Sequence, residues 1–370
     1  MSTSSPRLFQ PWQIGPLRLP NRIVIAPMCQ YSALDGSATD WHTMHVGHLA
    51  MSGAGLLILE ATAVSPEGRI SPQDLGLYSD ANEAALARVL AATRRYSTMP
   101  IAIQLAHAGR KASTLAPWKG GAQIAPGQPE GWKTVAPSAL PFLEHYDAPR
   151  ALSLDDMGRI REDFAEAARR AARLGLDGVE VHSAHGYLLH QFLSPLANQR
   201  TDAYGGSLEN RMRFPLEVFD AVRAAFPADK AVWVRVSATD WVDGGWTVDD
   251  TIAYAKALQA RGCAAIDVSS GGLSAKQAIP LGPGYQVPLA QRLKDEVGMP
   301  TMAVGLITEP AQAEAILAQG QADAVALARA MLYNPRWPWH AAAALGAQVS
   351  APPQYWRSAP HGVKNLFAGA

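Results

Sequence analysis

The sequence contains little cysteine and no excess of either charge. Cys29 and Cys263 are the only cysteines in 370 residues, which excludes a disulfide framework and a metal site built from cysteines alone. Lysine plus arginine and aspartate plus glutamate number 32 each, so the formal net charge is zero. Such a chain has no basic surplus that could neutralise a run of phosphates or hold it on an anionic membrane. We therefore expect neither a nucleic-acid nor a membrane partner.

Long apolar runs and targeting segments are missing as well. No uncharged apolar run approaches the roughly 18 residues that suggest a membrane span. The first residues, MSTSSPRLFQPWQIG, show no basic region followed by an apolar one. Two unpaired cysteines fit a reducing compartment, and we expect an unprocessed cytoplasmic protein. No Walker-type or Gly-x-Gly-x-x-Gly loop follows any predicted strand, which argues against a Rossmann nucleotide-binding domain.

Eight short apolar runs recur along the chain, and each is followed by a stretch with helical spacing. This alternation predicts strand–helix units with a parallel sheet. The runs do not alternate polar with apolar residues, as expected for strands that are covered on both faces. The predicted strands are Ile23–Met28, Leu56–Ala63, Ile101–Ala106, Gly178–His182, Val232–Ser237, Ala265–Ser269, Thr301–Gly305 and Ala324–Ala328. Eight units favour a closed (β/α)8 TIM barrel of class α/β, although a doubly wound open sheet with an appendage would give a similar pattern.

The segments between and after these strands can also be interpreted. Ser153 and Asp156 form a plausible capping pair at the start of an amphipathic helix. About seventy residues separate the third strand from the fourth, and loops of this length are usually lids or binding loops. We therefore predict a lid over about 110–150 and a carboxyl-terminal tail over 346–370. No linker divides the sequence, so residues 1–370 are predicted to form a single domain.

Polar residues gather where the fourth predicted strand ends, and strand ends of this kind carry the reactive groups of a barrel. As neutral imidazoles, His182 and His185 can donate N–H groups to a carbonyl oxygen, as an oxyanion hole does. As a His-x-x-His pair, they can instead supply two metal ligands. No Asp, Glu or Cys nearby offers an obvious third ligand, so we favour the donor pair. Tyr187 is protonated near neutral pH and can act as a general acid, although packing is the commoner role of a tyrosine.

Other strand ends contribute further candidates. Cys29 lies beside Tyr31, and this position makes a functional role as tenable as the usual buried packing of a free cysteine. Arg235 lies on an otherwise apolar strand, where an unpaired guanidinium would be very unfavourable, so it needs an acceptor or an anion. Gly305 ends the seventh predicted strand and Arg329 follows the eighth, and the loops at these strand ends often form the phosphate site of a barrel. Arg329 could alternatively pair with a surface carboxylate.

Four longer strings are shared with a known protein family. They are Asn21–Tyr31 (NRIVIAPMCQY), Gln104–Lys111 (QLAHAGRK), His182–Tyr187 (HSAHGY) and Asn198–Phe214 (NQRTDAYGGSLENRMRF). With these strings the chain resembles the old yellow enzyme family along nearly its whole length. It is most similar to the branch with a flavin-contacting cysteine, which includes bacterial xenobiotic reductases and thermophilic-type ene reductases. The resemblance implies a single TIM barrel that binds FMN without a covalent bond.

The resemblance also implies roles for individual residues. The flavin-binding residues would be Ala26, Pro27, Met28, Cys29, Ala63, Gln104 and Arg235, with Gly305, Ala328 and Arg329 at the phosphate. NADPH or NADH would give a hydride to the flavin, and the flavin would then reduce the double bond of an enone, a nitroalkene or a quinone. His182 and His185 would hold the substrate carbonyl, and Tyr187 would protonate the α carbon. Cys29 would tune the flavin potential, and Tyr31 would shape the substrate pocket.

The tail string Gln354–Arg357 (QYWR) resembles a segment that, in this branch, enters the active site of a neighbouring subunit. A homodimer or homotetramer with a shared site is therefore expected, and either Trp356 or Arg357 is the residue that would contact substrate. A disordered tail on a monomer is the alternative. Relatives with an iron–sulfur cluster are excluded by the two cysteines. A metal-dependent barrel lyase or aldolase and a flavoprotein without turnover are the remaining alternatives.

Overall fold

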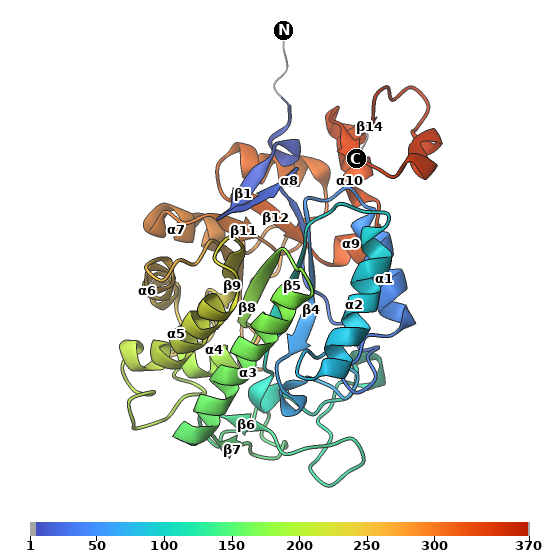
Figure 1. The fold of residues 1–370 in the computed structure, drawn as a ribbon. Coiled ribbons are helices and arrows are strands. Elements are labelled where there is room, and N and C mark those ends of the chain that lie inside the picture. The colour runs from blue at the N-terminus through green and yellow to red at the C-terminus, as the bar shows by residue number, and fades with distance from the viewer. Residues whose placement is uncertain (1–4, 369–370) are drawn as a thin grey trace.

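Eight parallel strands close into one barrel (Figure 1). A computed structural model describes residues 5–368. The barrel strands, in the order in which they pair, are β3 (Ile23–Ile25), β4 (Leu56–Ala63), β5 (Ile101–Ala106), β8 (Gly178–Ser183), β9 (Ala231–Ser237), β10 (Ile266–Ser269), β11 (Thr301–Ala303) and β12 (Ala324–Leu327), and β12 pairs with β3. The predicted TIM barrel is confirmed, and the open doubly wound sheet is wrong.

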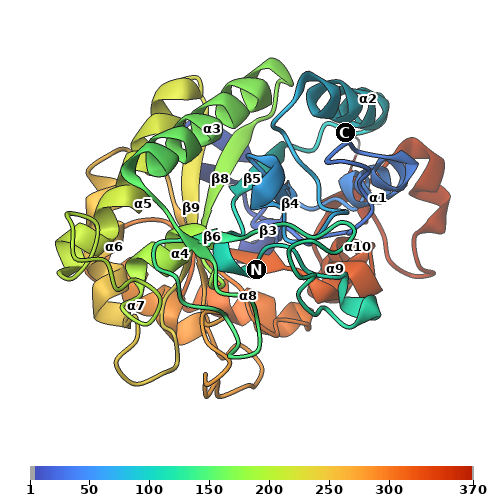
Figure 2. The same cartoon turned by 90° about the horizontal axis from the view of Figure 1, so that it is seen from below.

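Helices surround this barrel (Figure 2). The outer helices are α1 (Asp40–Ala50), α2 (Asp80–Arg94), α3 (Leu154–Arg173), α5 (Leu208–Ala225), α6 (Val248–Gln259), α7 (Val287–Val297), α8 (Pro310–Ala318) and α10 (Trp337–Leu345), with the shorter α4 (Leu188–Leu193) and α9 (Arg329–Tyr333) at strand ends. The predicted capping box of α3 is present: Ser153 Oγ accepts a hydrogen bond from the Asp156 amide, and Asp156 Oδ2 accepts one from the Ser153 amide. No helix within residues 5–368 is long and apolar enough to cross a membrane.

Three predicted strands end earlier than the apolar pattern indicates. The first ends at Ile25 rather than Met28, although the Ala26 amide still donates to the carbonyl of Leu327. The seventh ends at Ala303, because Gly305 has a φ of 119°, which an extended strand does not use. The eighth ends at Leu327 rather than at Ala328. The residues beyond these ends turn away from the sheet and line the mouth of the barrel.

The inside of the barrel is filled by side chains. The Trp233 side chain is fully buried, and Gly178 on the neighbouring strand makes room for it, since a Cβ at Gly178 would lie 2.4 Å from Trp233 Cζ3. An antiparallel hairpin of β1 (Trp12–Ile14) and β2 (Leu17–Leu19), which the sequence analysis missed, covers the amino-terminal end. The barrel is therefore packed with side chains below its mouth. Within the barrel, a ligand can bind only at the carboxyl-terminal ends of the strands.

The predicted lid and tail lie at opposite ends of the barrel (Figure 1). The lid contains two short parallel strands, β6 (Val135–Ala136) and β7 (Arg150–Ala151), and covers the carboxyl-terminal ends of the barrel strands. The tail contains β13 (Val349–Ser350), a 3₁₀ helix over Pro353–Ser358, and β14 (Phe367–Ala368), which pairs with β13. The lid can therefore screen the mouth of its own barrel, whereas the tail cannot.

Candidate active site

The end of β8 carries a cluster of three aromatic side chains. The ring of His182 lies 5.2 Å from that of His185 and 5.0 Å from that of Tyr187, both in edge-to-face arrangement. A tight turn brings them together, with φ angles of 58° at His185 and 72° at Gly186. A Cβ at Gly186 would lie 2.2 Å from the carbonyl oxygen of Gly272, so this close approach requires glycine. Three of the predicted catalytic residues are thus adjacent in space.

Hydrogen bonds define which ring nitrogens of the two histidines can donate. His182 Nδ1 accepts a bond of 3.3 Å from the Ala184 amide, which places the proton of a neutral ring on Nε2. His185 Nε2 lies 2.7 Å from Ser269 Oγ, and its Nδ1 is the nitrogen left for a ligand; Nδ1 carries the proton when Ser269 donates its hydroxyl hydrogen to Nε2. Burial, together with the positive charge of Arg235, holds the pKa of both histidines well below its usual value. Both rings are neutral at pH 7, so each carries a single N–H.

Lys111 adds a positive charge to this cluster. Its Nζ donates to the carbonyls of His185 and Gly272, both at 2.8 Å, and lies 5.1 Å from the ring centre of Tyr187. Burial, and then the charge of Arg110, lowers the pKa of Lys111 to about 8. The sequence analysis quoted this lysine only as part of a motif and assigned it no role. Its place four residues after the strand-end His107 was the only local signal, and that position does not indicate its partners.

Protonated groups line the same region. Burial raises the pKa of the Tyr187 phenol and of the Tyr31 phenol well above the usual range, so both keep their protons at pH 7. Burial, with Asp74 and Glu60 nearby, also raises the pKa of the Cys29 thiol. A thiol of this kind is not a thiolate nucleophile. Cys29 can therefore donate a weak hydrogen bond, and covalent catalysis by this residue is disfavoured.

The loop after β3 is fixed by a carboxylate from β4. Glu60 Oε2 accepts a 2.8 Å hydrogen bond from the amide of Gln30, and its Oε1 lies 3.3 Å from Nε2 of His42. This contact orders the predicted flavin-binding segment, Ala26, Pro27, Met28 and Cys29, beside the ends of β4 and β5. Ala63 and Gln104 lie in those two strands, as predicted, and both are buried. Glu60 therefore anchors the end of the loop that carries this segment.

Arg235 has a buried partner that the sequence analysis missed. Its Nε lies 3.4 Å from Asp267 Oδ2 on the neighbouring strand β10, and 6% of Arg235 and none of Asp267 is exposed. Glu180, on the other side in β8, is also fully buried and accepts hydrogen bonds from Gln104 and Trp233. A charged residue within an apolar barrel strand was the signal used for Arg235, and it applies equally to Glu180 and Asp267.

The predicted phosphate site lies at the ends of two neighbouring strands, β11 and β12. Gly305 follows β11, and a Cβ there would lie 2.7 Å from Gln286 Nε2. Ala328 precedes α9, and Arg329 is its first residue and is exposed. Burial raises the pKa of Tyr285 in this region, and the positive charge of Arg329 opposes that effect. The structure thus brings Gly305, Ala328 and Arg329 to one side of the mouth.

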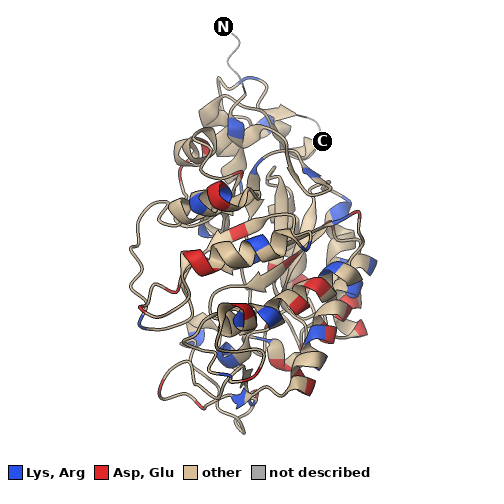
Figure 3. Cartoon of the chain, turned by 90° about the vertical axis from the view of Figure 1, so that its left-hand side faces the viewer, with Lys and Arg blue, Asp and Glu red and all other residues tan. Residues whose placement is uncertain are grey.

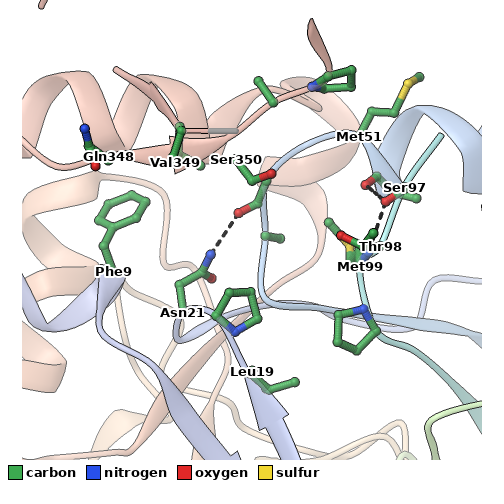
Figure 4. A pocket seen from close by; sticks show the side chains of 18 of the residues that line it. Phe9, Leu19, Asn21, Met51, Ser97, Thr98, Met99, Gln348, Val349 and Ser350 are labelled. Atoms are coloured by element: carbon green, nitrogen blue, oxygen red, sulfur yellow. Dashed lines mark hydrogen bonds between the residues drawn. The ribbon is translucent and has the colours of Figure 1, made fainter. Parts of the chain in front are cut away.

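The structure does not bring Trp356 and Arg357 to the mouth of their own barrel. Trp356 Nε1 donates to the carbonyl of Ala351, and the tail borders a cavity of about 670 Å³ at the amino-terminal ends of the strands (Figure 4). There, Asn21 Nδ2 donates to the carbonyl of Gly53, and a Cβ at Gly53 would lie 2.5 Å from the carbonyl oxygen of Ser350. The tail therefore lies away from the active site of its own barrel.

The described residues 5–368 contain no metal-binding cluster at this site, and charges of both signs are mixed on one side of the barrel. Among residues 5–368, no group of three or more His, Cys, Asp or Glu side chains could hold a metal ion. On the side of the barrel drawn in Figure 3, basic and acidic residues are interspersed along the helices. The His-x-x-His pair is surrounded by serine, tyrosine and lysine side chains, which suit a neutral ligand with a polar oxygen.

Comparison with known proteins gives the family. A family model described as the NADH:flavin oxidoreductase / NADH oxidase family matches residues 7–348. The chain belongs to this family. It is 44% identical over 352 residues to an NADPH dehydrogenase of Geobacillus thermodenitrificans, covering 95% of this chain and 98% of that protein.

Solved structures agree with this assignment. Morphinone reductase superposes with a TM-score of 0.76 at 32% identity, covering 100% of this chain and 98% of that one, and another of its structures is a complex with tetrahydroNAD. The old yellow enzyme homologue from Zymomonas mobilis superposes with a TM-score of 0.74 at 27% identity, covering 99% and 97%. The predicted membership of the old yellow enzyme family is confirmed. The chain is an oxidoreductase, and its cofactors are FMN and a nicotinamide dinucleotide.

Proposed function

We propose that this chain is an ene reductase that reduces the carbon–carbon double bond of α,β-unsaturated carbonyl compounds, and also accepts nitroalkenes and quinones. The observation that carries the proposal is the pair of neutral histidines, His182 and His185, beside the protonated phenol of Tyr187. Two N–H donors can hold a carbonyl oxygen on which negative charge develops. A phenol in contact with one of them can supply a proton.

FMN fits the mouth of the barrel. Arg235 Nε faces Asp267, and no hydrogen bond from the two terminal guanidinium nitrogens is present among residues 5–368, so these nitrogens are available for an acceptor above. Gln104 and Ala63 would contact the ring, and the segment from Ala26 to Cys29 would line one edge. The phosphate would bind at Gly305, Ala328 and Arg329. When bound there, FMN supplies the hydride chemistry, and the positive charge of Arg235 favours its reduced, anionic form.

The side chains then have separate tasks. His182 Nε2 and His185 Nδ1 would donate to the substrate oxygen, which withdraws electron density from the alkene and makes its β carbon electrophilic. Tyr187 would transfer its phenolic proton to the α carbon. Lys111, whose charge helps to keep both histidines neutral, would preserve their donor role across the neutral pH range. The ring centre of Tyr31 lies 5.6 Å from that of Trp118 in the lid, so Tyr31 would shape the outer wall of the pocket. The Cys29 thiol would tune the reduction potential of the flavin.

The anaerobic spectrum of the protein tests this function. We expect NADPH, or NADH if the chain prefers it, to bleach the yellow colour of the flavin and cyclohexenone to restore it. A protein that is bleached but never reoxidised by any activated alkene would be a flavoprotein without turnover. A panel of enones, nitroalkenes and quinones then gives the substrate class.

We further propose a homodimer or homotetramer in which Trp356 or Arg357 contacts substrate in a neighbouring subunit. The support is that the tail leaves its own barrel at the end opposite to the active site (Figure 1). Deleting residues 351–370 is expected to lower the molecular mass in solution and to raise the Michaelis constant for enones. The single variants Trp356→Ala and Arg357→Ala then show which side chain is responsible. A fully active truncated monomer would refute the shared site.

A further inference from the structure

Three charged side chains lie inside the barrel, below the position proposed for the flavin. Glu180, Arg235 and Asp267 come from the adjacent strands β8, β9 and β10, and the pairing of these strands brings them to neighbouring levels of the barrel interior. Arg235 is 6% exposed, and Glu180 and Asp267 are fully buried. The proposed reaction assigns no task to either carboxyl group.

Glu180 is held by two neutral donors. Gln104 Nε2 donates to its Oε1 and Trp233 Nε1 donates to its Oε2, both at 2.7 Å. These bonds fix the carboxyl group in one orientation. Gln104 is also a proposed flavin contact. The Gln104 side chain would therefore link Glu180 to the flavin ring.

Asp267 is paired less completely. Its Oδ2 lies 3.4 Å from Arg235 Nε, but neither of its oxygens has a hydrogen-bond donor within residues 5–368 when every carboxyl group is ionised. Burial raises the pKa of Asp267, and the charge of Arg235 and then the neighbouring Glu180 oppose that effect. A proton on Glu180 would supply the missing donor.

The net charge of Glu180, Arg235 and Asp267 also indicates that one carboxyl group is protonated. Two ionised carboxylates and one guanidinium would leave a net negative charge in an enclosed barrel, and an unpaired buried charge is strongly disfavoured. Burial, and then the neighbouring Asp267, raises the pKa of Glu180 to about 8, against the opposing effects of Arg235 and the two neutral donors. Above this layer, His182 and His185 are neutral, and the positively charged Lys111 donates to the carbonyls of His185 and Gly272. One bound proton makes the layer neutral at pH 7.

We propose that Glu180 and Asp267 share one proton at neutral pH and, as a carboxyl pair, position Arg235 and set the charge beneath the flavin. The inference rests on the proposed placement of FMN over Arg235. Such a pair titrates as a unit, since two adjacent carboxyl groups cannot both ionise at no cost. A hydride from the nicotinamide brings two electrons and one proton, so the flavin gains one negative charge. The added negative charge on the flavin raises the proton affinity of the carboxyl pair. If the pair is already deprotonated when the flavin is reduced, it takes up one proton from solvent.

The infrared spectrum of the FMN-loaded protein tests the shared proton. At pH 7 we expect the carbonyl band of a protonated carboxylic acid, and this band should disappear in Glu180→Gln. It should also disappear in Asp267→Asn, because Glu180 without its negative neighbour ionises and becomes the carboxylate that faces Arg235. Asp163→Asn is the control. Asp163 is a half-buried carboxyl on α3 outside the barrel, its pKa is raised by burial to about 6, and its removal should leave the band unchanged.

Two results would overturn the shared proton. Absence of the band in the unsubstituted protein would mean that both carboxyls are ionised, and a band that persists in Asp267→Asn would mean that Glu180 is protonated by burial alone. Burial raises the pKa of Asp74 to about 7, so Asp74→Asn is a second control that removes the other carboxyl able to give such a band. If Glu180→Gln or Asp267→Asn fails to fold, the Asp74→Asn protein still decides the matter. Its band should be present at pH 7 and be lost as the pH rises above 8.

The reduction potential of the bound FMN tests the effect on the flavin. Below pH 8, the unsubstituted protein and Glu180→Gln both have a neutral layer, and their potentials should agree. Above pH 8, ionised Glu180 adds a negative charge in the unsubstituted protein, whose potential should become the lower of the two. Identical potentials at every pH, or a constant difference, would overturn the coupling.

Neither measurement uses an alkene. A protein that shows both signatures but reduces no enone would refute the proposed function and support the carboxyl pair. A protein that reduces enones but lacks the band would do the reverse.

Discussion

Replacing Tyr187 with phenylalanine isolates the proton transfer from the rest of the reaction. The substitution removes one hydroxyl group and keeps the ring, which lies 5.0 Å from the His182 ring and 5.1 Å from Lys111 Nζ. A positioned general acid typically contributes about 10² to 10⁴ in rate. At 1.36 kcal/mol for each factor of ten, the barrier to reoxidation of the flavin by an enone should rise by about 3 to 5 kcal/mol. Reduction of the flavin by NADPH involves no phenolic proton and should be nearly unchanged.

Anaerobic rapid mixing measures the two half-reactions separately. Flavin bleaching by NADPH gives the first rate, and recovery of the flavin absorbance with cyclohexenone gives the second. Tyr204→Phe is a matched control, because it removes a hydroxyl group that bonds to Glu217 outside the site, and both of its rates should stay at the unsubstituted values. Equal slowing of both half-reactions in Tyr187→Phe would refute the role as proton donor and indicate a distorted site.

Three further substitutions test the histidine pair, the barrel interior and the capping box of α3. His182→Ala should weaken the binding of a phenol by about tenfold or more, since a hydrogen bond to a developing anion contributes about 1.5 to 3 kcal/mol; an unchanged charge-transfer band on phenol titration would contradict the donor pair. Gly178→Ala should destabilise the fold by about 1 to 3 kcal/mol, because the new Cβ lies 2.4 Å from the Trp233 ring, and urea unfolding measures it. Asp156→Asn should cost about 1 kcal/mol at pH 7. A hydrogen bond from Arg150 holds the pKa of Asp156 well below its usual value, so this stabilisation is present above the unfolded pKa and should shrink as the pH falls below about 4. A difference that is independent of pH would contradict the ionic part of the cap.

The architecture was largely predictable because its signals are local in sequence. An apolar run that is covered on both faces marks a strand wherever it occurs, and β4 and β5 begin and end at the predicted residues. The polar residues at strand ends were equally visible, since strand direction alone places His182, His185 and Tyr187 at the barrel mouth. The resemblance then supplied the flavin and the oxidoreductase class, which the family comparison confirms.

Contacts between distant parts of the chain were decided by the tertiary structure. Nothing in the sequence indicates that Lys111 reaches the carbonyl of His185, because a lid of unknown path separates the two. The proximity of Glu180 and Asp267 depends on strand order and register, and a shift of one residue would turn either side chain out of the barrel. The protonation of buried groups depends in turn on such contacts, because burial and neighbouring charges set each pKa. By itself, the sequence determined the barrel and the chemical groups at its mouth. Only closure of the barrel decided which buried groups lie close enough to influence the protonation of one another.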